Sequence, residues 1–153
     1  MTTIDTILFA TDFSEISDHA FEYAASLASV YDSRLVIVHV VMHQTDLREF
    51  YVPHQNFDDL DRYVEEGAQR KMAEFRKAWE VRFPNVVTHV VTGIPYEEIL
   101  KKAAEESASL IVMGTHGRQG FQHFLFGSTA ERVVKLSTCP VMTVRSPHAP
   151  EVE

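Results

Sequence analysis

The stretch LIVMGTHGRQGFQHFLFGSTAERVVKLS, residues 110–137, holds a strand pattern, a glycine-spaced loop and a helical pattern, in that order. The apolar run at residues 110–113 is typical of a buried parallel strand. Gly114, Gly117 and Gly120 then space a loop, and a Gly-Ser-Thr sequence leads into the helical pattern. Glycine lets backbone approach an anion closely, and the first turn of a helix offers unpaired N–H groups. The stretch therefore favours a phosphate-binding loop.

The rest of the chain alternates between strand and helix patterns. Strands are predicted at residues 4–10, 34–41, 86–92, 110–113 and 141–145, and helices at residues 14–31, 57–83, from 95 onward and at 130–136. Such alternation predicts a parallel sheet with helices on both faces. No repeat, linker or low-complexity segment divides the 153 residues. We expect one doubly wound α/β domain at residues 1–146 and a flexible tail at residues 147–153.

Two predicted helices carry an apolar face that we expect to lie on the sheet, because residues three or four apart share one side of a helix. The members are Ile16, Ala20, Tyr23, Ala24, Leu27 and Ala28 in the first helix, and Leu60, Val64, Ala68, Met72, Phe75, Trp79 and Phe83 in the second. The opposite face of the second helix is charged and is expected to be solvated. Residues 42–56 form a connection of unusual length, which we expect to be functional or mobile.

Charge and composition exclude several classes of protein. The net charge of −8 argues against nonspecific binding to nucleic acid or to anionic membrane. The N-terminus resembles no signal peptide, and no apolar run reaches transmembrane length. The single cysteine, Cys139, excludes an internal disulfide. Together these features predict a cytoplasmic protein with no nucleic-acid or membrane partner.

Several chemistries lack their sequence signals. There is no GxxxxGK[ST] motif, and no GxGxxG follows the first strand, while FMN binding of the flavodoxin type would rest on fold analogy alone. The eight histidines show no zinc spacing, so structural or surface roles are favoured. Cys139 has no charged neighbour to activate it as a nucleophile. Ser128 lacks a GxSxG setting, which favours a helix cap or a phosphate ligand.

Asp12 lies just past the carboxyl end of the first predicted strand. Open α/β sheets place ligands at that edge. Aspartate at the start of a helix is also a common cap. Position alone therefore leaves two interpretations open, ligand contact or capping of the next helix.

The chain resembles the universal stress protein family in four segments. The family's nucleotide-binding motif, with two residues between glycines and nine before a Gly-Ser pair, is matched by Gly114, Gly117, Gly127 and Ser128. The other segments are ILFATDFS at residues 7–14, VHV at 38–40 and CPV at 139–141. The resemblance spans about residues 4–145 and implies the strand order 3-2-1-4-5 in a five-stranded sheet. With that order, Asp12 and the glycine loop would flank one crevice.

The resemblance implies ATP as the ligand, with Mg²⁺ or Mn²⁺ bound mainly through the phosphates. The implied binding residues are Ala10, Thr11, Asp12, Val40, Met113, Gly114, Gly117, Arg118, Gly127, Ser128 and Thr129. Val40 would contact adenine through its main chain, and Asp12 would lie near the ribose or a metal. Backbone amides and the Ser128 and Thr129 hydroxyls would donate to phosphate. Arg118 either offsets phosphate charge or points to solvent.

The favoured function is a nucleotide-responsive regulatory or stress-protective protein. The alternatives are a dimeric scaffold that does not use nucleotide and a slow ATPase. The loop has no lysine and no assigned base, so ATP turnover is expected to be slow or absent. A homodimer through residues 141–145 is expected, because this edge strand carries little protection against pairing. The stress signal, the pathway and any protein partner are not encoded in a recognisable motif.

Overall fold

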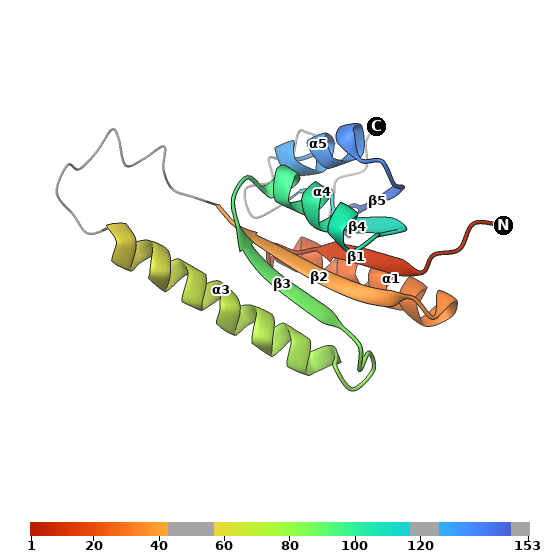
Figure 1. Ribbon diagram of the computed structural model, residues 1–153, viewed down its shortest axis with the longest axis horizontal. Coiled ribbons are helices and arrows are strands. Elements are labelled where there is room, and N and C mark those ends of the chain that lie inside the picture. Colours follow the sequence, from red (N-terminus) through yellow and green to blue (C-terminus); the bar gives the residue numbers. More distant parts are fainter. Residues whose placement is uncertain (43–56, 117–125, 148–153) are drawn as a thin grey trace.

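The computed structural model describes residues 1–42, 57–116 and 126–147. Its elements are β1 (Thr6–Ala10), α1 (Glu15–Tyr31), β2 (Arg34–Val41), α3 (Phe57–Trp79), β3 (Val87–Thr92), α4 (Pro95–Glu105), β4 (Leu110–Gly114), α5 (Ser128–Leu136) and β5 (Val141–Val144). The five strands form one parallel sheet in the order β3-β2-β1-β4-β5 (Figure 1). The predicted fold class and strand order are therefore confirmed.

Helices cover both faces of the sheet because alternate residues of each strand point to opposite sides. On β1, Ile7 and Phe9 face α1 and α3, while Leu8 packs against α4 and α5. All five residues of β1 are buried, which explains its continuous apolar run. The two hydrophobic clusters hold β1 and β4 side by side at the centre of the sheet.

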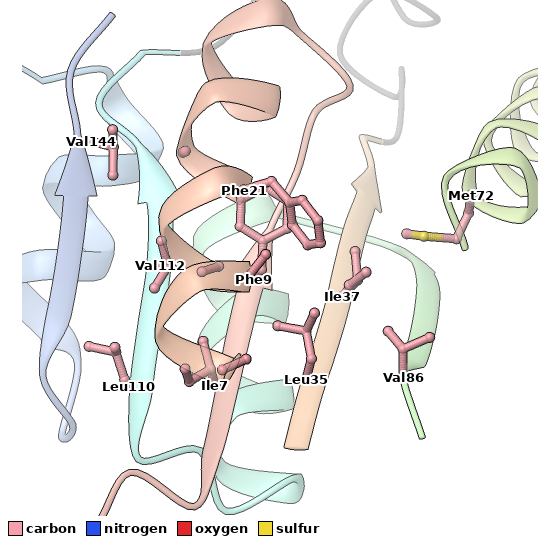
Figure 2. Packing of buried hydrophobic residues seen from close by; sticks show 14 residues of the cluster. Ile7, Phe9, Phe21, Leu35, Ile37, Met72, Val86, Leu110, Val112 and Val144 are labelled. Atoms are coloured by element: carbon pink, nitrogen blue, oxygen red, sulfur yellow. The ribbon is translucent and has the colours of Figure 1, made fainter. Parts of the chain in front are cut away.

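An aromatic cluster fixes α1 and α3 to one face. Figure 2 shows Phe21 of α1 beside Phe9 of β1, and their ring centroids are 4.9 Å apart. Phe21 also meets Phe75 and Trp79 of α3, each at 4.8 Å. These edge-to-face contacts anchor the C-terminal half of α3, where Met72 is also buried.

The N-terminal half of α3 differs from the prediction. Leu60 and Val64 were expected in the core, but they are 49% and 41% exposed. The helix runs past the edge of the sheet (Figure 1), so its first turns have no sheet beneath them. The apolar spacing is regular along the whole helix, and regular spacing does not reveal where the sheet ends.

Three further expectations are corrected by local contacts. Tyr23 was expected in the core but is 45% exposed, with its ring edge-on to His19 at 5.5 Å. The second predicted helix ends at Trp79 rather than residue 83, because the Arg82 and Phe83 amides turn back to the Trp79 carbonyl. The last predicted helix begins at Ser128, two residues earlier than expected.

Candidate functional site at the carboxyl ends of β1 and β4

The carboxyl ends of β1 and β4 are neighbours in the sheet. Ala10 pairs with Met113, and both residues are buried. The turns that follow, Thr11–Asp12 after β1 and the segment from Gly114 after β4, therefore leave the sheet side by side. This is the point where the order of connections reverses, and ligands of open α/β sheets bind at such points.

The turn after β1 is held by bonds from β2 and α1. The Thr11 amide donates to the Val38 carbonyl over 2.9 Å, and the Thr11 hydroxyl lies 2.7 Å from that of Ser17. His39 Nδ1 lies 2.8 Å from the Thr11 carbonyl oxygen and acts as its donor. Thr11 is buried, so its polar groups are paired within the protein. The predicted binding residue Thr11 is thus a rigid support for the turn.

Asp12 does not cap α1. The N-cap is Ser14, whose hydroxyl accepts from the Ser17 amide over 3.2 Å. One Asp12 carboxylate oxygen accepts from the Ser14 amide at 3.0 Å, which forms a tight turn at the sheet edge. The interpretation in which Asp12 only caps the next helix is therefore wrong. Asp12 shapes the turn and stays at the edge.

Phe13 adopts a left-handed backbone conformation with φ 59°. A non-glycine residue in this region costs free energy unless its surroundings hold it. Here the Phe13 amide donates to the Thr11 hydroxyl over 3.0 Å. The Phe13 ring also lies 4.4 Å from that of His39, centroid to centroid. These contacts fix the course of the chain immediately after Asp12.

Gly114 sits where the turn after β4 crosses α1. A Cβ atom at this position would lie 3.0 Å from Ile16 Cγ2 and 3.4 Å from the His116 carbonyl oxygen. The distance to Ile16 is tighter than an ordinary contact, so this neighbour would have to give way. Gly114 therefore serves close packing of the turn on α1.

Thr115 connects the turn to β5 and α5. Its amide donates to the Val144 carbonyl over 3.0 Å, and its carbonyl accepts from the Gly127 amide over 2.6 Å. The two ends of the glycine loop are thereby joined by a backbone hydrogen bond. The loop residues between them include Gly117 and Arg118, which lie outside the described residues.

The start of α5 supplies backbone donors. Gly127 is the N-cap with φ −70°, an ordinary conformation that does not require glycine. No side chain of the described residues caps this helix. Ser128 is exposed and Thr129 half-buried at its first turn. Ser128 was predicted as a cap or phosphate ligand, and the structure places it one residue after the cap.

Val40 lies near the carboxyl end of β2 and is half-buried against the cluster under α4 and α5.

Acidic side chains lie close together in the turn after β1 and the first turn of α1. Burial, followed by the nearby Asp12 and Glu15 carboxylates, raises the pKa of Asp18 above its usual range. A negative ligand beside Asp12 would need a compensating cation. Among the described residues, no group of three His, Cys, Asp or Glu side chains could hold a metal ion.

Sequence reasoning missed Thr115 and His116. Thr115 is 3% exposed, and its hydroxyl lies 3.0 Å from His116 Nδ1. His116 Nε2 is buried and has no hydrogen-bond partner among the described residues. Both residues lie between Gly114 and Gly117, the first two glycines of the motif. That position in the sequence was the signal that could have identified them.

Fold and site define a doubly wound α/β protein with a glycine-spaced loop after the fourth strand. The model of the universal stress protein family matches residues 3–145, and the chain belongs to that family. The chain is 34% identical over 146 residues to universal stress protein MJ0531 of Methanocaldococcus jannaschii, covering 92% of this chain and 82% of that protein. The solved structure of hypothetical protein MJ0577 superposes with a TM-score of 0.82 at 30% identity, covering 96% of this chain and 99% of that chain.

Some solved structures of this fold contain nucleotides. One universal stress protein is a complex with cAMP, at TM-score 0.66 and 21% identity, covering 97% of this chain and 100% of that chain. Another, from Archaeoglobus fulgidus, is a complex with dAMP, at TM-score 0.64 and 18% identity, covering 94% of this chain and 99% of that chain.

In the described part of this chain, no helix has the length and apolar character to cross a membrane.

Proposed function

We propose that this protein binds ATP at the carboxyl ends of β1 and β4 and acts as a nucleotide-responsive regulatory or stress-protective protein. The observation that carries the proposal is the bond between Gly127 and Thr115, which places the start of α5 against the turn after β4. It brings N–H groups of the first helical turn to the edge where this fold takes ligands. Related proteins of the same fold in complex with cAMP and dAMP support a nucleotide as the ligand.

The phosphates would lie between the glycine loop and α5. Backbone amides near Gly117, Gly127 and Ser128 would donate to phosphate oxygens, with the Ser128 and Thr129 hydroxyls beside them. Gly127 has an ordinary φ, so its backbone conformation does not require glycine. The missing side chain would instead let the ligand approach closely. Arg118 would contribute positive charge from the same loop.

The base and ribose would lie over the ends of β1 and β2. Val40 would contact adenine through its main chain, next to the rigid turn of Ala10 and Thr11. Asp12 would face the ribose or the cation, and Met113 and Gly114 would form the floor. A divalent ion, Mg²⁺ or Mn²⁺, would supply charge compensation through the phosphates. The Asp12, Glu15 and Asp18 carboxylates interact with one another and would repel an uncompensated phosphate.

Turnover is proposed to be slow or absent. Phosphoryl transfer to water needs an oriented nucleophile and charge stabilisation beyond the metal. The glycine loop contains no lysine, and no residue in it is assigned as a general base. A steady-state ATPase rate near that of an ordinary kinase, lost in a single-site variant, would contradict this part of the proposal.

The test of binding is calorimetry with ATP and Mg²⁺ on Gly127→Val. A valine side chain would occupy the space that the phosphate needs, so we expect affinity to fall at least tenfold. Gly67→Val is the matched control, because a Cβ at Gly67 of α3 meets nothing within 4 Å. Equal ATP affinity in wild type and Gly127→Val would place the site elsewhere.

We also propose that β5 pairs with its own copy in a homodimer. The Pro140 carbonyl accepts from Ile111 of β4, and the Val144 carbonyl accepts from Thr115 just after β4. Strand alternation therefore turns the backbone groups of Val141 and Thr143 to the outer edge. A strand at the edge of a sheet with such groups exposed is prone to pairing. A twofold axis would make the new strand pair antiparallel.

Thr143→Pro tests the dimer because it removes an outer N–H and keeps those bonded to β4. We expect the dimer to weaken, while Thr143→Val retains it. Light scattering at micromolar concentration reports the mass. A monomeric wild-type protein under these conditions would overturn the proposal.

A further inference from the structure

His116 carries an unsatisfied polar atom in an otherwise well-paired turn. Its Nε2 is buried and meets no hydrogen-bond partner among the described residues. A buried polar group without a partner costs about 1–3 kcal/mol, so such atoms are rare and require an explanation. The residue stands two positions after Gly114, at the edge where the proposed nucleotide would bind.

The backbone around His116 leaves little freedom to relieve this cost. Gly114 packs on Ile16, and a Cβ there would be 3.4 Å from the His116 carbonyl oxygen. Thr115 is bonded through its amide to Val144 and through its carbonyl to Gly127. Both sides of the turn are thus tied to β5, α1 and the start of α5. These ties fix the backbone immediately before His116, and the Thr115 hydroxyl contacts its ring.

The Thr115 hydroxyl lies 3.0 Å from His116 Nδ1 and can either donate to this nitrogen or accept from it. Thr115 itself is 3% exposed. When this hydroxyl donates to Nδ1, the neutral imidazole carries its proton on Nε2. The unsatisfied atom is then an N–H donor. A phosphate group offers several anionic oxygens, and these accept hydrogen bonds from such a donor.

We propose that His116 Nε2 donates a hydrogen bond to a phosphate oxygen of the nucleotide, and that Thr115 is the positioning residue that fixes the required tautomer. This inference rests on the proposed function and narrows it. It makes His116 a determinant of preference for phosphorylated nucleotides over the bare nucleoside. Because Nε2 is buried, the nucleotide can reach it only after a local rearrangement of the protein. The free energy of that rearrangement lowers the observed affinity.

The experiment compares ATP with adenosine in calorimetry on five proteins: wild type, His116→Phe, His116→Gln, Thr115→Val and Thr115→Ser. Losing a hydrogen bond to a charged group weakens binding about ten- to a hundredfold. We expect that loss for ATP in His116→Phe and no change for adenosine. His116→Gln should retain part of the ATP affinity, because the glutamine amide can donate a hydrogen bond at a similar distance from the backbone. Thr115→Val should weaken ATP binding severalfold, and Thr115→Ser should not.

A spectroscopic measurement keeps the proposal testable if a variant folds poorly. Long-range ¹H–¹⁵N spectra of wild type should show His116 protonated at Nε2, with a shift on adding ATP and none on adding adenosine. A proton on Nδ1, or identical shifts with both ligands, would overturn the proposal. Unchanged ATP affinity in His116→Phe, or equal losses for ATP and adenosine, would also overturn it and would indicate a bound water as the partner or a packing role.

Nucleotide binding and the role of His116 can be contradicted by different results. If wild type binds neither ATP nor adenosine, the proposed function is wrong and this inference falls with it. If wild type and Gly127→Val differ for ATP while His116→Phe matches wild type, nucleotide binding stands and only the role of His116 is lost.

Discussion

The two ends of the sheet are built differently. At the amino ends of the strands, the Ser109 amide donates to the Thr6 carbonyl over 2.8 Å, and its hydroxyl accepts from the Asp5 and Thr6 amides. Nearby, Glu106 accepts from Arg34 and lies 2.7 Å from His89 Nε2. These contacts pair polar groups with one another and close the end of the sheet.

At the carboxyl ends, one buried polar atom lacks a partner. His116 Nε2 has no hydrogen-bond partner among the described residues, and α5 begins without a side-chain cap from them. A buried polar atom without a partner is a cost that a purely structural edge has no reason to keep. This difference is what the proposed function predicts, with one end stabilising the fold and the other accepting a ligand.

The largest expected effect is at the carboxyl end, in Gly114→Val. Its side chain would press on Ile16, so unfolding free energy should fall by roughly 1–3 kcal/mol, and ATP affinity should fall with it. Urea unfolding and calorimetry measure the two effects. Adding Ile16→Ala should return part of the stability. If Gly114→Val were as stable as wild type, the close packing of this turn would not be what glycine serves.

A smaller effect is expected at the amino end, in Glu106→Gln. Arg34, followed by His89, holds the pKa of Glu106 below its usual range. The Arg34 side chain is 41% exposed, which limits the loss of stability to about 1 kcal/mol or less. ATP affinity should not change. Glu105→Gln, one residue earlier, is the matched control.

The pH dependence of this ion pair has a definite sign. Because the folded pKa of Glu106 is lowered, its contribution is fully present above the usual pKa of 4.5 and is lost as pH falls through the folded value. The stability difference between wild type and Glu106→Gln should therefore shrink on acidification below that range. Urea titrations at several pH values measure it. A difference that grew on acidification would contradict the pairing.

The smallest effect is expected at a position belonging to neither end. Gly67 lies within α3 with open space around its Cβ direction. Gly67→Ala should raise the free energy of unfolding by roughly 0.5–1 kcal/mol through helix propensity, without altering ATP affinity. Thermal unfolding measures the gain. Reduced affinity in this variant would mean that the ligand site extends to α3.

The sequence predicted most of the fold because its central strands, β1 and β4, are almost entirely buried. The apolar runs of β1 and β4 can be buried only as strands inside the sheet. The order of the strands, by contrast, came from the family resemblance. The course of α3 was harder, since the spacing of Leu60 and Val64 is the same as that of buried Met72. The extent of the sheet beneath a helix is a tertiary property, and periodicity does not carry it.

The sequence named candidate site residues but not the contacts between them. The motif identified Gly114 and Gly127 as candidates. It did not reveal the backbone hydrogen bond between Thr115 and Gly127, which depends on the fold. The tautomer of His116 depends on the orientation of the Thr115 hydroxyl. Gly117 and Arg118 lie outside the described residues, so their roles stay predictions.

The most direct test of the central claim is a titration of the ¹⁵N-labelled protein with ATP and Mg²⁺, followed by amide chemical shifts. The account predicts the largest shifts at Asp12, His116 and Ser128, with Arg34 and Glu106 unmoved at the opposite end of the sheet. Shifts confined to the amino end, or none at saturating ATP, would contradict it.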